Sequence, residues 1–428
     1  MILKLCNEVV HENEPWHFIF VEIILDGLCN LSKLLLYFYH RILKRRTPYT
    51  LISWRFFVPF GLADLDSEAY KLHKYVFQNA WKQLPRWLYA LGVIYSLIVW
   101  YAVWGPWHYG KHLYRRTYSN QGENDLQNIA TSHYLKQAFF AYLRGMSTLS
   151  FRALKFADIP RSDWWEYVPN QLLPHWHLVL QKKYGDRASK IISNKRVFAE
   201  VMGNAGLAVV ATHVLTGIED FDLNGDWFFK PEVSSQAKGC LILESTGDDT
   251  VRLRSKDGEL ELTKTDAIQA YLKRSACAKA YLVQPRLFSH AELTKFYDNN
   301  DLAVVRIVTL RSTQGFTVWR ANIELPMKNK VFIKPYAINV DTGRVSGLDN
   351  LMLPHWRALM DLVIKAHTEV AELNTVGWDV AITDDGPVLL EGNLNWGTVT
   401  LQDDERGGMV DSPYLNMVRE SGLRDLIL

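Results

Sequence analysis

The segment Val376–Gly397 constrains the fold of this chain more than any other stretch, because it has the pattern of two short strands joined by a tight turn. The first strand carries Asp379, and the second carries Glu391 and Asn393, two residues apart and therefore on one face. An Asp-Asp-Gly sequence between the strands favours the turn. Three converging oxygen-bearing side chains suit a hard cation such as Mg²⁺, and the alternative is a hairpin with a solvated polar face.

A second polar feature is predicted upstream, in residues 226–239. An aromatic strand there ends at Lys230, followed by Pro231 and a loop of small polar residues. A lysine at the end of a buried strand is costly unless its ammonium group reaches an anion. Backbone N–H groups of such a loop can close over phosphate oxygens. Neither a Walker pattern nor a GxGxxG occurs, which excludes the P-loop and Rossmann classes.

Two further segments are predicted strands: Tyr281–Leu287 and Leu302–Leu310. With the earlier segments they form a specific order of motifs along the chain. The succession FFKP, SSQAKG, YLVQPRL, VVRIVTL and GWDVAITDDGPVLLEGN resembles the ATP-grasp superfamily. Within it, the chain most resembles the sugar-transfer-associated ATP-grasp family of bacterial polysaccharide gene clusters. The resemblance runs from Pro174 to the C-terminus. It implies an α+β fold in which two lobes clasp ATP, and an ATP-dependent, ADP-forming ligase.

The resemblance also implies roles for individual residues. Arg306, at the middle of its strand, would point at phosphates or at an acylphosphate intermediate, and Lys238 would neutralise the γ phosphate. The implied metal ligands are Asp379, Glu391 and Asn393, for Mg²⁺ and with two ions expected. The implied nucleotide-binding residues are Lys195, Lys230, Ser234, Ser235, Gln236, Gly239, Gln284 and Leu287.

Two of these roles have alternatives that the residues leave open. Lys195 also suits the start of a helix capped by Ser193 or Asn194, and Lys238 also suits a solvated loop. Four more polar residues are expected near the cleft: Arg320, Asn322, Asn339 and Asn350.

The implied chemistry is transfer of the γ phosphoryl group of ATP to a carboxylate, followed by attack of an amine to form an amide. No GxSxG, HExxH or CxxC signature occurs, so no protein nucleophile or zinc site is expected. The expected substrate is a small-molecule or lipid-linked sugar of a surface polysaccharide. Two alternatives are a phosphotransferase that stops after phosphorylation and a non-catalytic, nucleotide-binding scaffold of a polysaccharide assembly complex.

The first 118 residues form a region of different character, predicted to be helical. They carry fourteen basic and eight acidic residues, a net charge of +6 against −4 for the remainder. Within them Trp87–Trp104 is uncharged, has aromatic residues at both ends and just reaches the length that spans a bilayer. An earlier amphipathic run, Trp16–His40, ends in a basic cluster at 41–46 that suits anionic headgroups.

Three arrangements of this region stay open: a span, a helix that lies on or re-enters the membrane, and a soluble helical domain. Contact with the inner face of the cytoplasmic membrane is expected through residues 16–116, because an ATP-using domain is cytoplasmic. The expected division is a helical region at 1–118, a helical connecting segment at 119–190 and an ATP-grasp domain at 191–428.

Two remaining features of the sequence are its overall charge and one clear helical pattern. A net charge of +2 over 428 residues, without a dense basic stripe, argues against a nucleic-acid partner. The clearest predicted helix is His355–Asn374. Its expected core positions recur at three- and four-residue steps: Trp356, Leu359, Val363, Ala366 and Val370.

Overall fold

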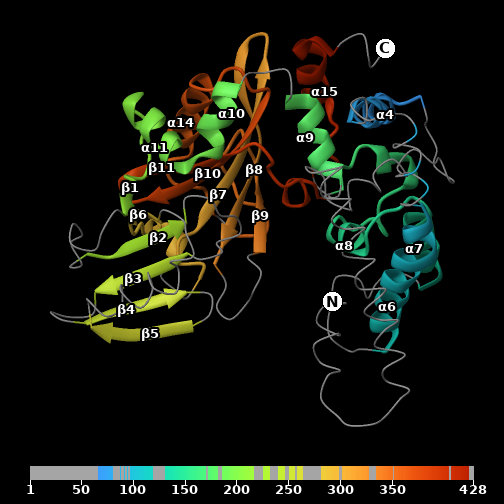
Figure 1. Cartoon of the computed structure of the whole chain (residues 1–428), viewed down its shortest axis with the longest axis horizontal. Helices are drawn as coiled ribbons and strands as arrows, with labels where there is room; N and C mark the ends of the chain where they lie inside the picture. Colours follow the sequence, from blue (N-terminus) through green and yellow to red (C-terminus); the bar gives the residue numbers. More distant parts are fainter. Residues whose placement is uncertain are drawn as a thin grey trace. The chain divides into compact units, whose positions relative to one another are not determined.

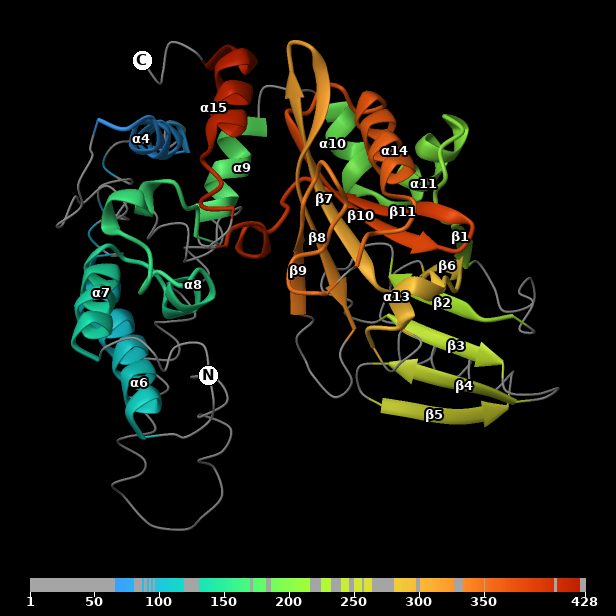
Figure 2. The ribbon, with the colours of Figure 1, turned by 180° about the vertical axis from the view of Figure 1, so that it is seen from behind.

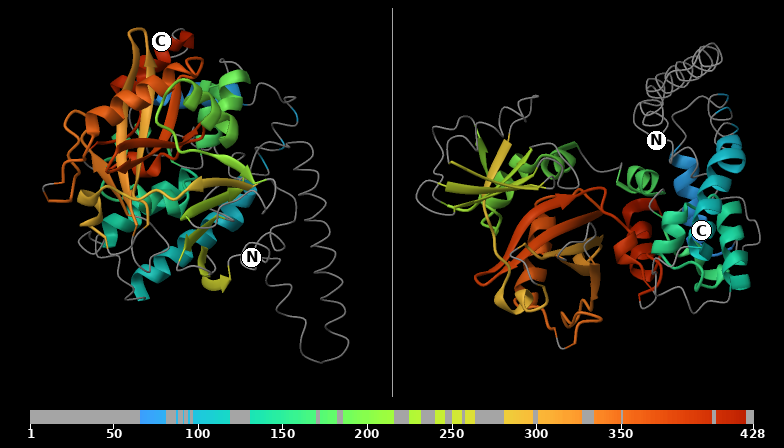
Figure 3. Two further views of the ribbon diagram at one scale, coloured as in Figure 1. Left: turned by 90° about the vertical axis from the view of Figure 1, so that its left-hand side faces the viewer. Right: turned by 90° about the horizontal axis from the view of Figure 1, so that it is seen from below.

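The computed structural model describes residues 66–80, 87, 91, 94, 97–118, 131–169, 172–181, 186–215, 225–231, 240–245, 250–255, 258–263, 281–297, 301–326, 334–349, 351–403 and 406–423. The chain divides into two units, 1–51 and 52–428, and all described residues belong to the second unit. Figure 1 labels its helices and strands, and Figure 3 shows them from two further sides.

The helices of the described residues fall into two groups. Those before residue 182 include α4 (Glu68–Ala80), a π-helical turn (Val99–Trp104), α6 (Gly105–Tyr118), α7 (Thr131–Leu143), α8 (Thr148–Ala153), a 3-10 turn (Arg161–Trp165) and α9 (Leu173–Gln181), and residues 87, 91, 94, 97 and 98 are helical as well. Those after it are α10 (Asp186–Ser193), α11 (Lys195–Asn204), α13 (Ala291–Thr294), α14 (Trp356–Thr368), a 3-10 turn (Val399–Leu401), α15 (Ser412–Val418) and a π-helical turn (Arg419–Leu423).

The strands of the described residues form two antiparallel sheets. A six-stranded sheet has the order β1-β6-β2-β3-β4-β5, and a five-stranded sheet has the order β11-β10-β7-β8-β9. The bounds are β1 His213–Leu215, β2 Trp227–Pro231, β3 Leu241–Ser245, β4 Thr250–Ser255, β5 Gly258–Thr263, β6 Tyr281–Pro285, β7 Val304–Ser312, β8 Gly315–Leu325, β9 Lys334–Ile338, β10 Thr375–Thr383 and β11 Gly386–Asn393. Helices and antiparallel sheets in one chain confirm the predicted α+β class.

Helices pack on the five-stranded sheet and form a hydrophobic core with it. α14 packs on β7, β8 and β11, and both α10 and α11 pack on β11 (Figure 2). The predicted helix is confirmed, although it begins at Trp356 and ends at Thr368, and residues 369–372 form turns. All five of its predicted core positions are buried. The apolar spacing continues past the helix end because Val370 enters the same core from a turn.

The chain after β11 packs against the helices that precede residue 182. The indole of Trp176 donates a hydrogen bond to the hydroxyl of Tyr414 at 2.6 Å, and a ring nitrogen of His177 lies 3.1 Å from the backbone oxygen of Trp396. Val410 N donates to Glu166 O at 2.9 Å. The early helices and the C-terminal segment therefore share one hydrophobic core.

Several predictions for the N-terminal region fall outside the described residues. The run Trp16–His40 and the basic cluster at 41–46 are among them, and Trp87–Trp104 is described at 87, 91, 94 and 97–104 alone. None of the helices formed by described residues combines the length and the apolar composition needed to cross a bilayer.

Candidate nucleotide-binding site

Four polar residues lie opposite one another on neighbouring strands of the five-stranded sheet. Glu391 on β11 opposes Asp379 on β10, Asp379 opposes Arg306 on β7, and Arg306 opposes Asn322 on β8. Directly opposed residues of antiparallel strands project from the same face, so these residues form a row. The amide of Asn393 donates to Asp379 Oδ2 at 3.3 Å. The predicted metal-binding residues therefore come together, and their role as ligands stays a prediction.

Arg306 is held by carboxylates on both sides. Its Nε and Nη2 atoms donate to the two oxygens of Asp379 at 2.8 and 3.0 Å, and its Nη1 lies 3.4 Å from Glu324 Oε1. Burial alone would lower the pKa of Arg306, but Asp379, Glu324 and Glu391 raise it above its ordinary value. Arg306 is therefore a fixed, permanently charged group on this face of the sheet.

Glu324 is a site residue that the sequence analysis missed. Burial, aided by the charge of Asp379, raises the pKa of its carboxyl, although Arg306 acts in the opposite direction. It stands two residues after Asn322 on β8 and so shares its face. That period of two was the available signal, because Asn322 was already expected near the cleft.

The position of Lys195 is compatible with both roles that the sequence left open, a helix start and a residue of the site. It is the first residue of α11, where the side chain of Asn194 caps the helix by accepting from the backbone N–H groups of Arg196 and Val197. Its Nζ atom also lies 3.7 Å from Glu391 Oε2. The cap therefore fixes the start of the helix, and the side chain reaches the polar row.

Lys230 brings the six-stranded sheet to the same site. It lies on β2 opposite Leu282 of β6, with 7% of its surface exposed. The pKa of Lys230 is lowered to about 8, chiefly by burial and also by the ammonium of Lys195, whereas Glu391, Cys240 and Asp379 act to raise it. Because these three charges act on the pKa of Lys230, Lys230 lies within electrostatic reach of the two carboxylates and of Lys195.

The charges of this site fit Mg²⁺ and a polyanionic ligand. Two ammonium groups close together, one of them buried, favour an anion, since an anion relieves both their repulsion and the cost of burial. In the described part of the chain no three His, Cys, Asp or Glu residues are arranged to hold a metal ion by themselves. Asp379, Glu391 and Asn393 instead offer two carboxylates and an amide, a set that suits Mg²⁺ when phosphate oxygens supply other ligands.

The remaining predicted nucleotide-binding residues divide into two groups. Gln284 is buried, and its Nε2 donates to Thr212 Oγ1 at 2.8 Å, so its side chain is engaged in holding the segment before β1. Leu287 is partly buried and follows β6 by two residues. The predicted phosphate loop lies outside the described residues, so its roles stay predictions: Ser234, Ser235, Gln236, Lys238 and Gly239.

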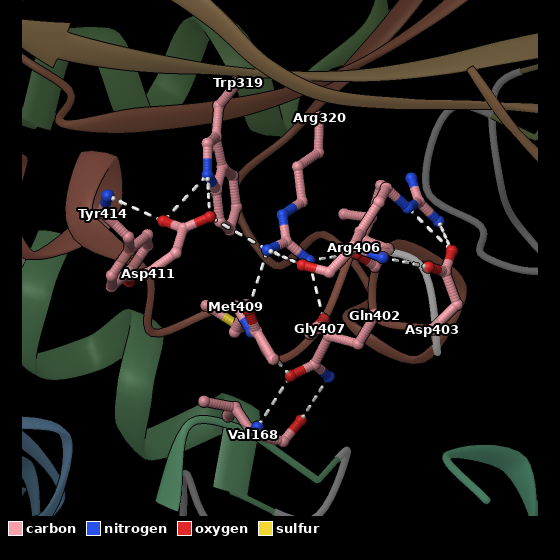
Figure 4. A network of polar contacts seen from close by, with 12 residues as sticks. Val168, Trp319, Arg320, Gln402, Asp403, Arg406, Gly407, Met409, Asp411 and Tyr414 are labelled. Atoms are coloured by element: carbon pink, nitrogen blue, oxygen red, sulfur yellow. Dashed lines mark hydrogen bonds and ion pairs between the residues drawn. The ribbon is translucent and has the colours of Figure 1, made fainter. Parts of the chain in front are cut away.

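Arg320 was expected near the cleft, but it instead binds residues 401–403 and 406–411, which we call the C-terminal loop (Figure 4). Its guanidinium donates to Asp411 Oδ2 at 2.9 Å and to the backbone oxygens of Leu401, Arg406, Gly407 and Gly408 at 2.7 to 3.1 Å. Beside it, Gln402 accepts from Val168 N at 2.8 Å and so joins the loop to the early helices. The donors of Arg320 are thus committed to the fold.

The three asparagines expected near the cleft have different outcomes. Asn322 stands in the polar row, is fully buried and donates from Nδ2 to Thr400 O at 3.0 Å. Asn339 instead stabilises a local turn, since its Oδ1 accepts from Asp341 N and Thr342 N. Asn350 lies outside the described residues.

The sequence matches the profile of a known protein family. The profile of the sugar-transfer associated ATP-grasp family matches residues 332–411, which hold β9, α14, β10, β11 and the C-terminal loop. The match confirms the predicted resemblance to the ATP-grasp superfamily and, within it, to this family. The match also supports the predicted ATP-grasp fold. A comparison with the sequences of curated proteins gives no match.

Several solved structures are similar to this chain. An L-amino acid ligase from Bacillus licheniformis is 12% identical with a TM-score of 0.33, over 50% of this chain and 42% of that chain. The ATP-grasp ligase PsnB, complexed with a precursor variant, Mg and ADP, is 17% identical with a TM-score of 0.35, over 59% and 67%. N5-carboxyaminoimidazole synthetase from Staphylococcus aureus, complexed with ADP, is 11% identical with a TM-score of 0.36, over 51% and 48%. The chain spans about half the length of the first and the third.

Proposed function

We propose that this chain has an ATP-grasp fold and is an ATP- and Mg²⁺-dependent ligase that joins a carboxylate to an amine through an acylphosphate. One observation carries the proposal. Lys230 of the six-stranded sheet lies within electrostatic reach of Asp379 and Glu391 on the five-stranded sheet and of Lys195 at the start of α11. Two sheets that contribute cations and oxygen ligands to one site are suited to clasping a nucleotide and its metal.

In this proposal the ammonium groups of Lys195 and Lys230 hold phosphate oxygens of ATP. Lys238 and its loop cover the γ phosphate, as the resemblance implies. Asp379, Glu391 and Asn393 would hold Mg²⁺, with two ions proposed, and the metal would neutralise the charge of the phosphates. Asp379 already accepts from Arg306 and from Asn393, whereas Glu391 has Lys195 as its ion-pair partner. We therefore assign the larger share of metal binding to Glu391.

The proposed reaction has two steps. A carboxylate oxygen of the acceptor attacks the γ phosphorus, the bond from that phosphorus to the β–γ bridging oxygen breaks, and ADP leaves. The amine nitrogen then attacks the acyl carbon, the bond from that carbon to the phosphate oxygen breaks, inorganic phosphate leaves, and the nitrogen loses a proton to solvent. Arg306, fixed by Asp379 and Glu324, would stabilise the negative charge of the transferred group.

We propose that the acceptor or the amine is a sugar acid, an amino sugar or an amino acid of a surface polysaccharide. The description of the matched family, which associates it with sugar transfer, supports this substrate class. The proposal places the activity in polysaccharide biosynthesis or modification.

The test is ADP release from Mg·ATP with a panel of sugar acids and amino acids, each with and without an amine. ADP and amide that require both substrates would support the ligase. A phosphorylated product formed at the same rate without amine would show a phosphotransferase, and a protein that binds nucleotide but releases no ADP with any substrate would be a scaffold; either result contradicts the proposal. Glu391→Gln should abolish ADP release, whereas Glu372→Gln, which alters an exposed ion pair with Arg187, should not.

A further inference from the structure

Four apolar side chains before the π-helical turn are exposed. They are helical residues spaced four, three and four positions apart, so they fall on one face of a helix: Trp87, Leu91, Ile94 and Ile98. Each of the four residues exposes between 52% and 66% of its surface. Isolated exposed apolar residues are common, but four in a row on one helix face indicate a contact surface. We call these four residues the apolar stripe.

The chain that follows the apolar stripe is anchored by a different set of residues. Trp100 is buried, and its indole donates to Tyr142 O at 2.9 Å. The hydroxyl of Tyr109 donates to Met146 O at 3.0 Å. A Cβ on Gly105 would lie 2.5 Å from the ring of Tyr142, so the two helices approach closely there. Packing against α7 therefore uses these residues and leaves the apolar stripe exposed.

The charges that flank the apolar stripe in the sequence indicate what it contacts. Residues 87–104 contain no charged residue, whereas basic residues stand on both sides of them: Lys82, Arg86, Lys111, Arg115 and Arg116. A protein–protein interface is bordered by a polar rim. Apolar side chains with a terminal Trp, bordered by Lys and Arg alone, instead suit the boundary between headgroups and acyl chains of an anionic bilayer.

We propose that the apolar stripe docks the protein on the surface of a bilayer that contains anionic phospholipids, with the helix in the plane of the membrane. An in-plane helix places both sets of basic residues at the same headgroup layer, which a crossing helix cannot do. The inference does not depend on the proposed ligase activity.

The test is flotation of the full-length protein with unilamellar vesicles. Vesicles of phosphatidylcholine with 30 mol% phosphatidylglycerol are compared with vesicles of phosphatidylcholine alone. The test variant combines Leu91→Gln, Ile94→Gln and Ile98→Gln. The matched control combines Val214→Gln, Phe296→Gln and Met352→Gln, three exposed apolar residues elsewhere in the chain. Melting curves establish that both variants fold.

The proposal predicts that wild type and the control float with the anionic vesicles. It also predicts that the partition coefficient falls at least about tenfold for the test variant, since three apolar side chains no longer enter the bilayer. Binding should weaken on neutral vesicles and in 0.5 M salt. Equal flotation of the test variant, or no flotation of wild type, would overturn the proposal. So would a dimer in wild type that the test variant loses while neither protein floats, because the apolar stripe would then bind a second copy.

Discussion

The buried ammonium of Lys230 should make the nucleotide-free protein less stable than a variant without it. The fall in its pKa from 10.5 to about 8 means that the protonated form is disfavoured in the folded state. One pKa unit corresponds to about 1.4 kcal/mol, so the cost at pH 7 is about 3 kcal/mol. Lys230→Met removes the charge at nearly constant volume. We therefore expect the free energy of unfolding to rise by up to about 3 kcal/mol at pH 7.

The gain should depend on pH in a defined direction. The folded-state pKa lies below the unfolded value, so between pH 8 and 10.5 the unfolded state binds more protons and wild type becomes more stable as pH rises. The advantage of Lys230→Met is therefore complete at pH 7, falls to about 1.4 kcal/mol at pH 9.5 and disappears at higher pH. Urea denaturation at pH 7 and pH 9.5, followed by tryptophan fluorescence, measures both values.

The same variant should bind Mg·ATP more weakly. Loss of one charge-assisted hydrogen bond to a phosphate corresponds to about a 10- to 100-fold rise in Kd, measured by calorimetry at pH 7. Lys190→Met is the matched control, since Lys190 is exposed on α10. It should change neither the free energy of unfolding nor the Kd for Mg·ATP appreciably. A Lys230→Met protein that is no more stable than wild type and binds Mg·ATP equally well would refute the reasoning.

Three further predictions concern the loop, a close backbone contact and pH. Arg320→Ala should lower the free energy of unfolding, measured by urea denaturation, by about 3–5 kcal/mol, because five hydrogen bonds from a buried guanidinium are lost; a loss below 1 kcal/mol would contradict this role. Gly408→Ala should cost at least about 2 kcal/mol, since a Cβ would lie 2.4 Å from the backbone of Glu166, whereas Gly397→Ala meets nothing within 4 Å and should be neutral. The affinity for Mg·ATP should be constant between pH 6 and 7 and should fall above pH 8, because Lys230 loses its proton there. Lys230→Arg should abolish this pH dependence, since arginine stays charged. An identical pH profile in both proteins would exclude Lys230 from the nucleotide-binding site.

The parts of the site that could be predicted from the sequence are those set by local pattern. The hairpin of β10 and β11 follows from its alternation and its turn, so Asp379, Glu391 and Asn393 were placed together correctly. The bidentate contact of Arg306 with Asp379 depends instead on the register between β7 and β10, which joins residues 73 positions apart. Pairing at such separations is decided by the whole sheet and leaves no local signal.

The role of Arg320 illustrates a second limit. Four of its five acceptors are backbone carbonyls, which every sequence supplies, so nothing in the residue types indicates the contact. Glu324 could have been found, because it keeps the strand period of Asn322. The end of α14 could not have been predicted, since Val370 and Leu373 continue the apolar spacing after the helix has ended at Thr368.

The measurement that tests the central claim most directly is thermal unfolding with and without Mg·ATP, for wild type and for Glu391→Ala. A ligand at about 100 times its Kd adds roughly 2.7 kcal/mol to the folded state, so Tm should rise by a few degrees. We predict a rise in wild type that requires Mg²⁺ and is lost in Glu391→Ala. A well-folded wild type whose Tm does not respond to Mg·ATP, or a variant that responds equally, would contradict a nucleotide site built on Glu391.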